Sequence, residues 1–534
     1  MAWATLALIV ALGITLRLDQ FIEQVLIEDE WHAIHRILSF SSAETFRTFG
    51  HSDHCIPLTL LYAWLADHGG LSETLMRAPM MVAGVLLLCL FPWYIARRLG
   101  WPTALLFALF LAISPLLISY SRMARPYGLT VFLGWLALAL FLRYWTATTR
   151  RQVVLFGAGY VISSALTVWL HLIMAPFVAA PFIWGLWRLF KSADRNQRKT
   201  WFLRGTALAA GFAAVLAALI ALPFINDLTS LSSKSGADLP TLETLNGALH
   251  FWTGCSQTWA VVICVALMAL GVSSVCRLPI VQIGLFGIAL TVAGILLTRP
   301  AWVFNPVTFV RYLLPLLPLL LLFLAAGCLK SGQYLKKKLS FLRWWAVVII
   351  PLAAMILTSP LHQILRVPNS SSLGLFSLFD FRPEKNIVPK QMRGLLHPSP
   401  FWSQHAVWPV ASKRISVAPF SFESDKWPAP VWEISSNQRV IPAFLNGFCN
   451  NDRLGELLDP SDRRFRFRNA VFLADVQMLR DRRVDWIVWR KDSPGQKAGW
   501  DTTDMAACET KWRTVFGAPD YEDDFLMAYQ VKNL

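Results

Sequence analysis

The feature that most constrains the fold is a series of apolar stretches, each about as long as a lipid bilayer is thick. A helix that crosses the hydrocarbon core needs about 20 mostly apolar residues. Windows of this kind begin near Ala2, Ala78, Thr103, Gly128, Val153, Leu172, Gly205, Thr258, Pro279, Phe309 and Trp345. We therefore predict a polytopic α-helical membrane protein with about 11 spans, a class that the hydrophobic fraction of 55% also favours.

Two apolar segments need a separate interpretation. The first window, "MAWATLALIVALGITLRL", lacks a basic leader and a clear small-residue cleavage site. We therefore predict a retained first span rather than a signal peptide. The run from Leu58 to Ala66 is too short to span, so we expect it to lie at the interface or to re-enter the membrane.

The basic residues give the chain an orientation. If the N-terminus is cytoplasmic, the clusters at 97–98, 143–151, 188–204, 277 and 330–343 all fall inside, as the positive-inside rule requires. Arg17, on the outer side of the first span, is an exception. The outer side receives the loops 18–76, 121–127, 225–256 and 298–309 and the chain after residue 359. The net charge of +16 then reflects inner loops and contacts with membrane lipids, and we predict no nucleic-acid partner.

The composition changes from about residue 360, where long apolar runs end and Pro, Ser, Asp and Arg become more frequent. The segment 470–490 is typical of a strand, a helix and a second strand, and "RISVAPF", "PVWEI" and "FLMAYQV" favour further strands. We predict a transmembrane domain at 1–360 and a periplasmic α/β domain at 361–534. Cys449 and Cys508 both lie in this second domain, and whether they form a disulfide stays open.

Three consecutive carboxylates, Glu28, Asp29 and Glu30, follow the first span. Solvated acids that cap a helix would account for them without any catalytic role. Their crowding, however, raises the cost of ionising all three. The amphipathic stretch at 31–40 would also hold them at a fixed depth along the membrane surface. The loop 18–76 is therefore a candidate catalytic loop.

A second polar group in the same loop comprises His51, Asp53 and His54, which precede Pro57. Histidine and carboxylate ligands would suit zinc. The same pattern fits a polar helix entry with proline in its first turn. A divalent metal is therefore possible but not supported, we assign no metal ligand, and no cofactor is expected to be required.

Three arginines on the outer side run against the positive-inside bias. Arg122 and Arg125 stand three residues apart at a span end, where helical geometry places them on one face. Arg311 stands at the outer entry of the tenth span. Each is explained either as a snorkelling cation or as a guanidinium that binds phosphate oxygens bidentately. A lipid phosphate at headgroup depth is the expected partner of the second interpretation.

The order and sidedness of these motifs resemble the GT-C superfamily of polytopic glycosyltransferases. The closest branch contains the dolichyl-phosphate-mannose protein mannosyltransferases and the lipid A aminoarabinose transferase. The resemblance covers residues 1–360 and is carried by Asp29-Glu30, His54-x-x-Pro57-Leu58, Arg122-x-x-Arg125-Pro126-Tyr127, and Arg311-Tyr312 followed by Pro315 and Pro318. The sequence departs from some relatives, because the arginine turn carries no second acid and no WWDYG-like oligosaccharyltransferase signature is present.

The resemblance implies an inverting glycosyltransferase at the outer face of a bacterial inner membrane. The implied donor is a polyprenyl-phosphate-linked sugar, and the acceptor is a glycan, a lipid or a protein. The implied general base is Asp29, with Glu30 as the second catalytic residue. The expected donor-phosphate ligands are Arg122, Arg125 and Arg311, and the expected substrate-binding residues are His51, Asp53, His54 and Tyr127.

Other functions stay open beside this one. A polysaccharide polymerase or ligase would use a lipid-diphosphate donor and would need more than one phosphate-binding cation cluster. A transporter favours inverted repeats and charges near the bilayer midplane, and the sequence shows neither. A non-catalytic envelope assembly subunit would use the aromatic residues of the C-terminal region for docking.

Overall fold

The fold is that of a computed structural model of the 534-residue chain. It describes residues 2–19, 21, 30, 32–33, 36–37, 40–49, 55–69, 73–191, 194–338, 345–358, 361, 399–409, 412–418, 432, 436, 438–444, 471–472, 476–481, 483–491 and 505–534.

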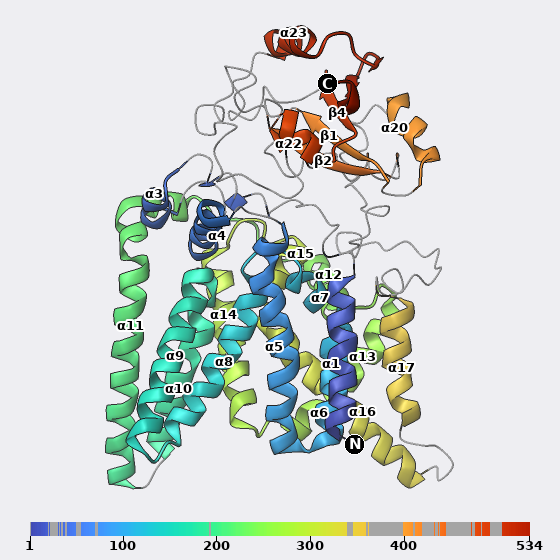
Figure 1. Cartoon of the computed structure of the whole chain (residues 1–534). Helices are drawn as coiled ribbons and strands as arrows, with labels where there is room; N and C mark the ends of the chain where they lie inside the picture. Colours follow the sequence, from blue (N-terminus) through green and yellow to red (C-terminus); the bar gives the residue numbers. More distant parts are fainter. Residues whose placement is uncertain are drawn as a thin grey trace.

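A bundle of long helices forms the first part of the chain (Figure 1). Its described elements are α1 (Ala2–Leu18), α5 (Glu73–Leu99), α6 (Trp101–Ile113), α7 (Pro115–Ser121), α8 (Tyr127–Trp145), α9 (Arg150–Leu170), η2 (Leu172–Met174), α10 (Ala175–Lys191), α11 (Arg195–Ser232), α12 (Leu242–Thr253), α13 (Thr258–Val275), α14 (Pro279–Thr298), α15 (Pro306–Tyr312), η3 (Leu314–Leu316), α16 (Leu317–Lys338) and α17 (Trp345–Leu357).

The described helices confirm the predicted class of multi-pass membrane protein. Eight of them are long and apolar enough to cross a membrane, or nine if the bent pair α6 and α7 makes one span. Two shorter apolar helices, Ala2–Leu18 and Val348–Leu357, fall on the first and last predicted windows. Each apolar window of the sequence therefore coincides with a helix, because apolar length is a local property that needs no tertiary information.

Close backbone contact joins α13 to α16 in the bundle. A Cβ atom added at Gly271 would lie 1.9 Å from the carbonyl oxygen of Phe323, and one at Gly327 would lie 1.8 Å from that of Leu267. Glycine is therefore required at both positions for these helices to approach each other. Small residues at such crossings are the usual means of helix packing in membranes.

The longest helix, α11, has little contact with the rest of the bundle. Only 11% of its most apolar 18-residue window is buried, whereas the other candidate spans bury 33% to 72%. Its backbone is non-helical at Asp227, where φ is −147° and ψ is 37°. Most of α11 therefore presents its apolar surface outward, and its last turns change direction at a kink.

Two short helices, α3 (Ser42–Arg47) and α4 (Ile56–Gly69), lie beyond one end of the long helices (Figure 1). Ser41 begins α3 with a capping box, in which Glu44 and Ser41 satisfy each other's backbone N–H groups. The predicted non-spanning run from Leu58 to Ala66 falls in α4, which is not among the described helices that pass as spans. Its buried Tyr62 donates a hydrogen bond to the carbonyl of Met76 at 2.8 Å, which ties α4 to α5.

The C-terminal region contains a six-stranded mixed sheet beyond the same end of the bundle (Figure 1). The order is β3-β2-β1-β4-β6-β5, in which β3, β2, β1 and β4 pair in parallel and β6 runs antiparallel to both β4 and β5. The elements are α20 (Pro400–Gln404), β1 (Arg414–Ala418), β2 (Arg439–Phe444), β3 (Val471–Phe472), α22 (Val476–Asp481), β4 (Trp486–Arg490), α23 (Met505–Phe516), β5 (Tyr521–Glu522) and β6 (Leu526–Gln530). These elements confirm the predicted α/β class of this region.

Individual strand predictions have different outcomes. The pattern at 470–490 is confirmed as β3, α22 and β4, and "RISVAPF" and "FLMAYQV" contain β1 and β6. The strand expected at "PVWEI" is wrong at Trp432, the residue of that segment that the structure describes, because Trp432 is helical. The Trp432 ring stacks on Trp402 with centroids 4.9 Å apart, so it is buried by aromatic packing rather than by strand alternation.

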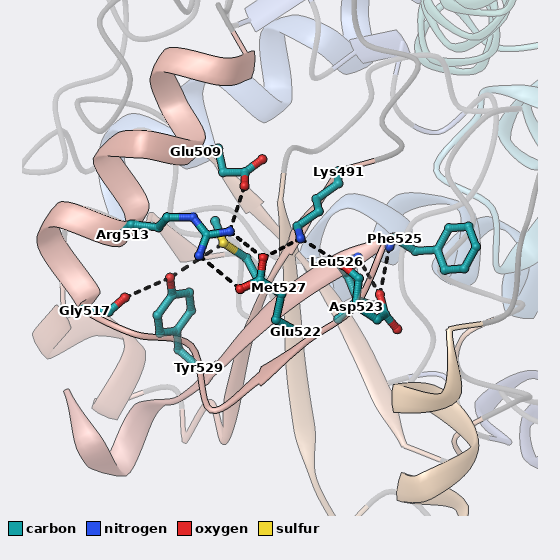
Figure 2. A network of polar contacts seen from close by, with 10 residues as sticks. All are labelled: Lys491, Glu509, Arg513, Gly517, Glu522, Asp523, Phe525, Leu526, Met527 and Tyr529. Carbon is teal, nitrogen blue, oxygen red and sulfur yellow. Dashed lines mark hydrogen bonds and ion pairs between the residues drawn. The ribbon is translucent and has the colours of Figure 1, made fainter.

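A network of charges joins α23 to the antiparallel edge of the sheet (Figure 2). Arg513 lies 3.0 Å from a carboxylate oxygen of Glu509 and 2.5 Å from one of Glu522, and Lys491 also lies 2.5 Å from Glu522. Glu522 thus accepts from cations that belong to two different elements. The next residue, Asp523, accepts from the backbone N–H groups of Phe525 and Leu526 and fixes the turn into β6.

Cysteine chemistry differs between the two regions. Cys55, Cys89, Cys255, Cys264, Cys276 and Cys328 are free thiols. Cys508, on α23, is disulfide-bonded. Cys449, which we considered as its partner, lies outside the described residues.

The charge network generates a prediction about acid stability. Hydrogen bonds from Arg513 and, second, Lys491 lower the pKa of Glu522 from 4.5 to about 2. A lowered carboxyl pKa contributes stability that is complete above pH 4.5 and is lost as the pH falls toward about 2. Because the carboxylate is partly exposed, we expect each pair to contribute only about 0.2–1 kcal/mol.

Thermal unfolding followed by tryptophan fluorescence between pH 5 and pH 2 checks this prediction. Between pH 5 and pH 2, the Tm of the Glu522→Gln variant should fall less than the Tm of wild type. Asp524→Asn, at an exposed neighbouring carboxylate, serves as the matched control and should keep the wild-type profile. Identical profiles for wild type and Glu522→Gln would contradict the prediction.

Candidate functional site

A buried ion pair fixes the end of the acidic cluster to the helix bundle. Arg77, on α5, donates from Nε to Oε1 of Glu30 at 2.8 Å and from Nη2 to Oε2 at 2.6 Å. The side chains of Arg77 and Glu30 are 0% and 1% exposed. Oε1 of Glu30 also accepts the backbone N–H of Ala124 at 2.7 Å. One carboxylate therefore joins the loop after α1, the start of α5 and the turn between α7 and α8.

That turn carries two of the arginines predicted from the sequence. It begins where α7 ends, with the backbone N–H of Arg122 bonded to the carbonyl of Ser119, and it leads into α8. Arg122 and Arg125 are 1% and 7% exposed, so both cations lie inside the protein rather than snorkel to the surface. Buried guanidinium groups are costly in a membrane protein and mark functional positions by default.

Tyr127, the first residue of α8, is the centre of a cluster of cations and aromatic rings. The guanidinium carbon of Arg125 lies 5.9 Å from the Tyr127 ring centroid, and that of Arg311 lies 5.5 Å from it. The ring of His171 lies 5.5 Å from Tyr127 and 5.5 Å from Tyr312. Residues from α8, α15 and the break between α9 and η2 thus meet within one small volume.

This cluster, which we call the Tyr127 cluster, lines a cavity of about 550 Å³. Lys234, which follows α11, adds a third cation to the wall beside Arg125 and Arg311. The remaining wall is mostly apolar and comes from Phe49, Cys55, Ile56, Pro126, Trp169, Leu170, Leu172, Ile173, Pro176, Ile220, Phe224, Leu228, Leu231, Ser232, Ser235, Gly294, Thr298, Pro300 and Ala301. A cavity with apolar walls and several cations fits an amphiphilic molecule with an anionic head.

Part of the cavity wall comes from the segment that runs from α3 to the start of α4. Phe49, which follows α3, packs edge-to-face on Phe224 of α11 with ring centroids 5.3 Å apart. Asn226, two residues further along α11, donates to the carbonyl of Arg47 at 3.3 Å. The thiol of Cys55, before α4, donates to the carbonyl of Leu170 at 3.3 Å. The loop therefore contacts both α11 and the α9 end of the cavity.

The structure places the predicted residues as follows. Arg125, Arg311 and Tyr127 meet at the cavity, although Arg311 is far from the other two in the sequence. Arg122 is buried in the same turn as Arg125. Glu30 is joined to that turn through Ala124. The predicted residues Asp29, His51, Asp53 and His54 lie outside the described residues, and their roles stay predictions.

Sequence reasoning missed three residues of this region: His171, Lys234 and Arg77. Tyr312 was part of the motif Arg311-Tyr312, although no role was predicted for it. His171 lies just before the apolar window that begins near Leu172, and it ends α9 as its C-cap. The sequence offered a signal for Lys234, because it is a cation in a loop that the predicted orientation places outside. Arg77 had none, because its carboxylate partner is remote in sequence.

Within the part of the chain that the structure describes, no group of three or more His, Cys, Asp or Glu side chains could hold a metal ion. The group His51, Asp53 and His54 lies outside that part of the chain.

Comparisons with known proteins give distant structural matches. No protein-family model matches the sequence, and no curated protein matches it. The crystal structure of ArnT from Cupriavidus metallidurans in the apo state matches with 10% identity, a TM-score of 0.45 and coverage of 98% of this chain and 97% of ArnT. ArnT bound to undecaprenyl phosphate matches with 10% identity, a TM-score of 0.46 and the same coverage.

A third match is the oligosaccharyltransferase of Archaeoglobus fulgidus in complex with Zn and sulfate. Identity is 14%, the TM-score is 0.40, and the match covers 95% of this chain and 70% of that one. At these low scores the matches carry no assignment of activity. The functional interpretation therefore depends on the geometry of the site.

The Glu30–Arg77 pair generates a prediction. Removing one partner of a buried ion pair leaves an uncompensated charge and typically costs about 3–5 kcal/mol. We expect Arg77→Gln to lower the Tm of the purified protein strongly. The double variant Glu30→Gln/Arg77→Gln should be less destabilised than Arg77→Gln alone, because no buried charge remains.

Thermal unfolding of the single and double variants in detergent measures this coupling directly. Arg98→Gln, at an exposed position near the other end of α5, is the matched control and should leave the Tm unchanged. Additive effects of the two single substitutions would show that the pair does not stabilise the loop.

Proposed function

We propose that this protein is an integral membrane glycosyltransferase that moves a sugar from a polyprenyl-phosphate donor to an acceptor, with inversion at the anomeric carbon. The observation that carries the proposal is the cavity, in which the guanidinium groups of Arg125 and Arg311 lie in a mostly apolar wall. The order of motifs in the sequence supports the same class. The acceptor is a glycan, a lipid or a protein.

The cavity suits each part of such a donor. Its apolar wall, which includes Leu228 of α11 and Ile173 of η2, offers contacts to the first isoprene units of the tail. Arg125 and Arg311 offer bidentate hydrogen bonds to phosphate oxygens. Tyr127 lies between these cations and offers a ring face and a hydroxyl to the sugar.

The same cations serve the chemical step. The acceptor oxygen attacks the anomeric carbon while the bond from that carbon to the phosphate oxygen breaks, and the phosphate leaves with the bonding electron pair. Arg125, Arg311 and the buried Arg122 stabilise the negative charge that develops on the leaving group. Because phosphate leaves as a stable anion, one base is enough to take the proton from the acceptor hydroxyl.

We propose Asp29 as that base. Both carboxylate oxygens of Glu30 accept hydrogen bonds, from Arg77 and from the backbone of Ala124. Glu30 therefore fits a role in holding the catalytic loop in place. It is the member of the predicted catalytic pair Asp29 and Glu30 that has this role. Asp29 precedes Glu30 in the chain and is the residue that the resemblance implies as the base, so it is the proposed proton acceptor.

The proposed domain organisation follows from the orientation of the chain. Residues 1–360 form the transferase, with its catalytic loop at 18–76, and residues 361–534 form the periplasmic α/β domain. The N-terminus is cytoplasmic, and the membrane is a bacterial inner membrane. The positive-inside distribution supports this orientation, and the disulfide at Cys508 supports an oxidising compartment for the C-terminal domain.

One observation favours a second candidate, a polymerase or ligase with a lipid-diphosphate donor. Lys234 supplies a third cation to the wall that already holds Arg125 and Arg311. An additional phosphate in the diester would add a further negative charge for these cations to bind. The choice between the two donors is therefore an outcome of the experiment below.

Purified protein incubated with a panel of polyprenyl-phosphate and polyprenyl-diphosphate sugars, together with a crude envelope acceptor fraction, tests the proposal by mass spectrometry. We expect loss of a monophosphate donor with wild type and none with Asp29→Asn. Turnover of diphosphate donors alone would favour the second candidate. Equal turnover by wild type and Asp29→Asn would move the base elsewhere, and no turnover of any donor would contradict the transferase assignment.

A further prediction concerns donor affinity. Arg311→Gln should raise the KM for the lipid donor by about tenfold or more, since a lost charge-assisted hydrogen bond typically costs about 1.5–3 kcal/mol. Steady-state kinetics at saturating acceptor measure this effect. Arg299→Gln removes an exposed cation from the same outer segment and should leave KM unchanged. Equal KM values for the two variants would exclude Arg311 from the donor site.

A further inference from the structure

Arg17 is a buried cation near the end of the first span, and its three side-chain nitrogens are all engaged. It is 1% exposed. Nη1 donates to the carbonyls of Gly13 at 2.9 Å and Ala112 at 3.2 Å, Nη2 donates to the carbonyl of Leu111 at 3.2 Å, and Nε donates to Oγ of Ser121 at 3.2 Å. Arg17, the exception to the positive-inside rule in the sequence, is thus buried inside the protein.

Two of the three carbonyls that accept from Arg17, those of Leu111 and Ala112, lie where α6 breaks. The bend between α6 and α7 is 61°, and α7 begins at Pro115. In a continuous helix the N–H of residue 115 would bond to the carbonyl of Leu111, but proline has no N–H. An unsatisfied carbonyl inside a membrane protein is costly, and a neighbouring side chain commonly supplies the missing donor. Arg17 supplies it here.

The charge of Arg17 also suits this location. Carbonyl groups at the C-terminal end of a helix carry the negative end of the helix dipole, which favours a cation. Arg17 therefore stabilises the bent arrangement of α6 and α7 and would stabilise a straight helix less, because a straight helix would satisfy more of its own carbonyls.

Arg17 contacts the other end of α7 as well. Ser121, the last residue of α7, accepts from Nε of Arg17 and donates to the carbonyl of Leu117 at 2.6 Å. A Cβ atom at Gly84 would lie 2.2 Å from Oγ of Ser121, so glycine leaves the room for this contact. The next residue along the chain is Arg122, which opens the turn that leads to Arg125 and Tyr127.

We propose that Arg17 is a positioning residue for this arginine turn. It holds the break that begins α7 and the serine that ends it, and so it sets the direction in which Arg122 and Arg125 enter the site. Glu30 also holds the turn, because its carboxylate accepts the N–H of Ala124. The role in donor binding rests on the proposed function, whereas the role in holding α7 rests on the contacts alone.

The test combines three substitutions with two measurements on the full-length protein in detergent. Arg17→Gln removes the charge and most of the donors, and Arg17→Lys keeps the charge with a single donor group. Arg17→Gln/Pro115→Ala restores the backbone N–H at position 115, so that α6 and α7 can form a continuous, stable helix. The measurements are the Kd for undecaprenyl phosphate and the rate of amide hydrogen exchange in residues 114–127, with the Tm recorded for each variant.

We expect Arg17→Gln to raise the Kd by about tenfold or more and to speed exchange in 114–127, with Arg17→Lys intermediate. The double variant should regain the Tm but not the affinity, a result that a purely stabilising role does not produce. Arg143→Gln, at an exposed position near the end of α8, is the control and should match wild type.

Two results would overturn the inference. An Arg17→Gln variant that keeps wild-type Kd and exchange rates would show that α7 does not depend on Arg17. A double variant that regains both Tm and Kd would show that the bend is irrelevant to binding. Wild type that binds no undecaprenyl phosphate is a distinct outcome, because it contradicts the proposed function and the donor-positioning role together.

Discussion

The architecture around the cavity depends on the ion pair between Glu30 and Arg77. Each partner is almost fully buried, and the carboxylate also accepts the backbone N–H of Ala124. Such a pair is stabilising only while both charges and their hydrogen bonds are present, because each ion alone has lost its hydration. Because of this pair, the loop that contains Glu30 and the arginine turn hold each other in place. The pair thereby connects the part of the proposed site that carries carboxylates to the part that carries cations.

Two buried arginines, Arg17 and Arg77, hold the same turn from different sides, and neither lines the cavity as the described residues define it. Their partners are backbone carbonyls and Ser121 in one case and Glu30 in the other. Holding the turn from within the bundle fixes the backbone from which Arg125 contributes to the cavity wall. This separation between holding and binding is what a preorganised anion site requires.

The sequence predicted the helices well and the site only in part, for a physical reason. Apolar length identifies a span from local composition, so every window coincided with a helix. The strand expected around Trp432 was wrong because five residues of alternating character do not distinguish strand alternation from aromatic packing in a helix. Arg125 and Tyr127 were identified because they share one motif. His171 was missed because only the packing of α8, α9 and α15 brings it to that motif, and no spacing in the chain records this packing. The charge of Lys234 in a predicted outer loop was a signal, but the sequence did not show that this loop meets the motif.

The exposure of α11 and its role in the cavity wall meet on one short stretch of the helix. Ile220, Phe224 and Leu228 contribute to the cavity wall, while most of the apolar span of α11 is covered by no other part of the described protein. The backbone kink at Asp227 lies between Phe224 and Leu228 in the chain. The direction of the last turns of α11 therefore determines where part of this wall lies, and a change in that direction would change the shape of the cavity.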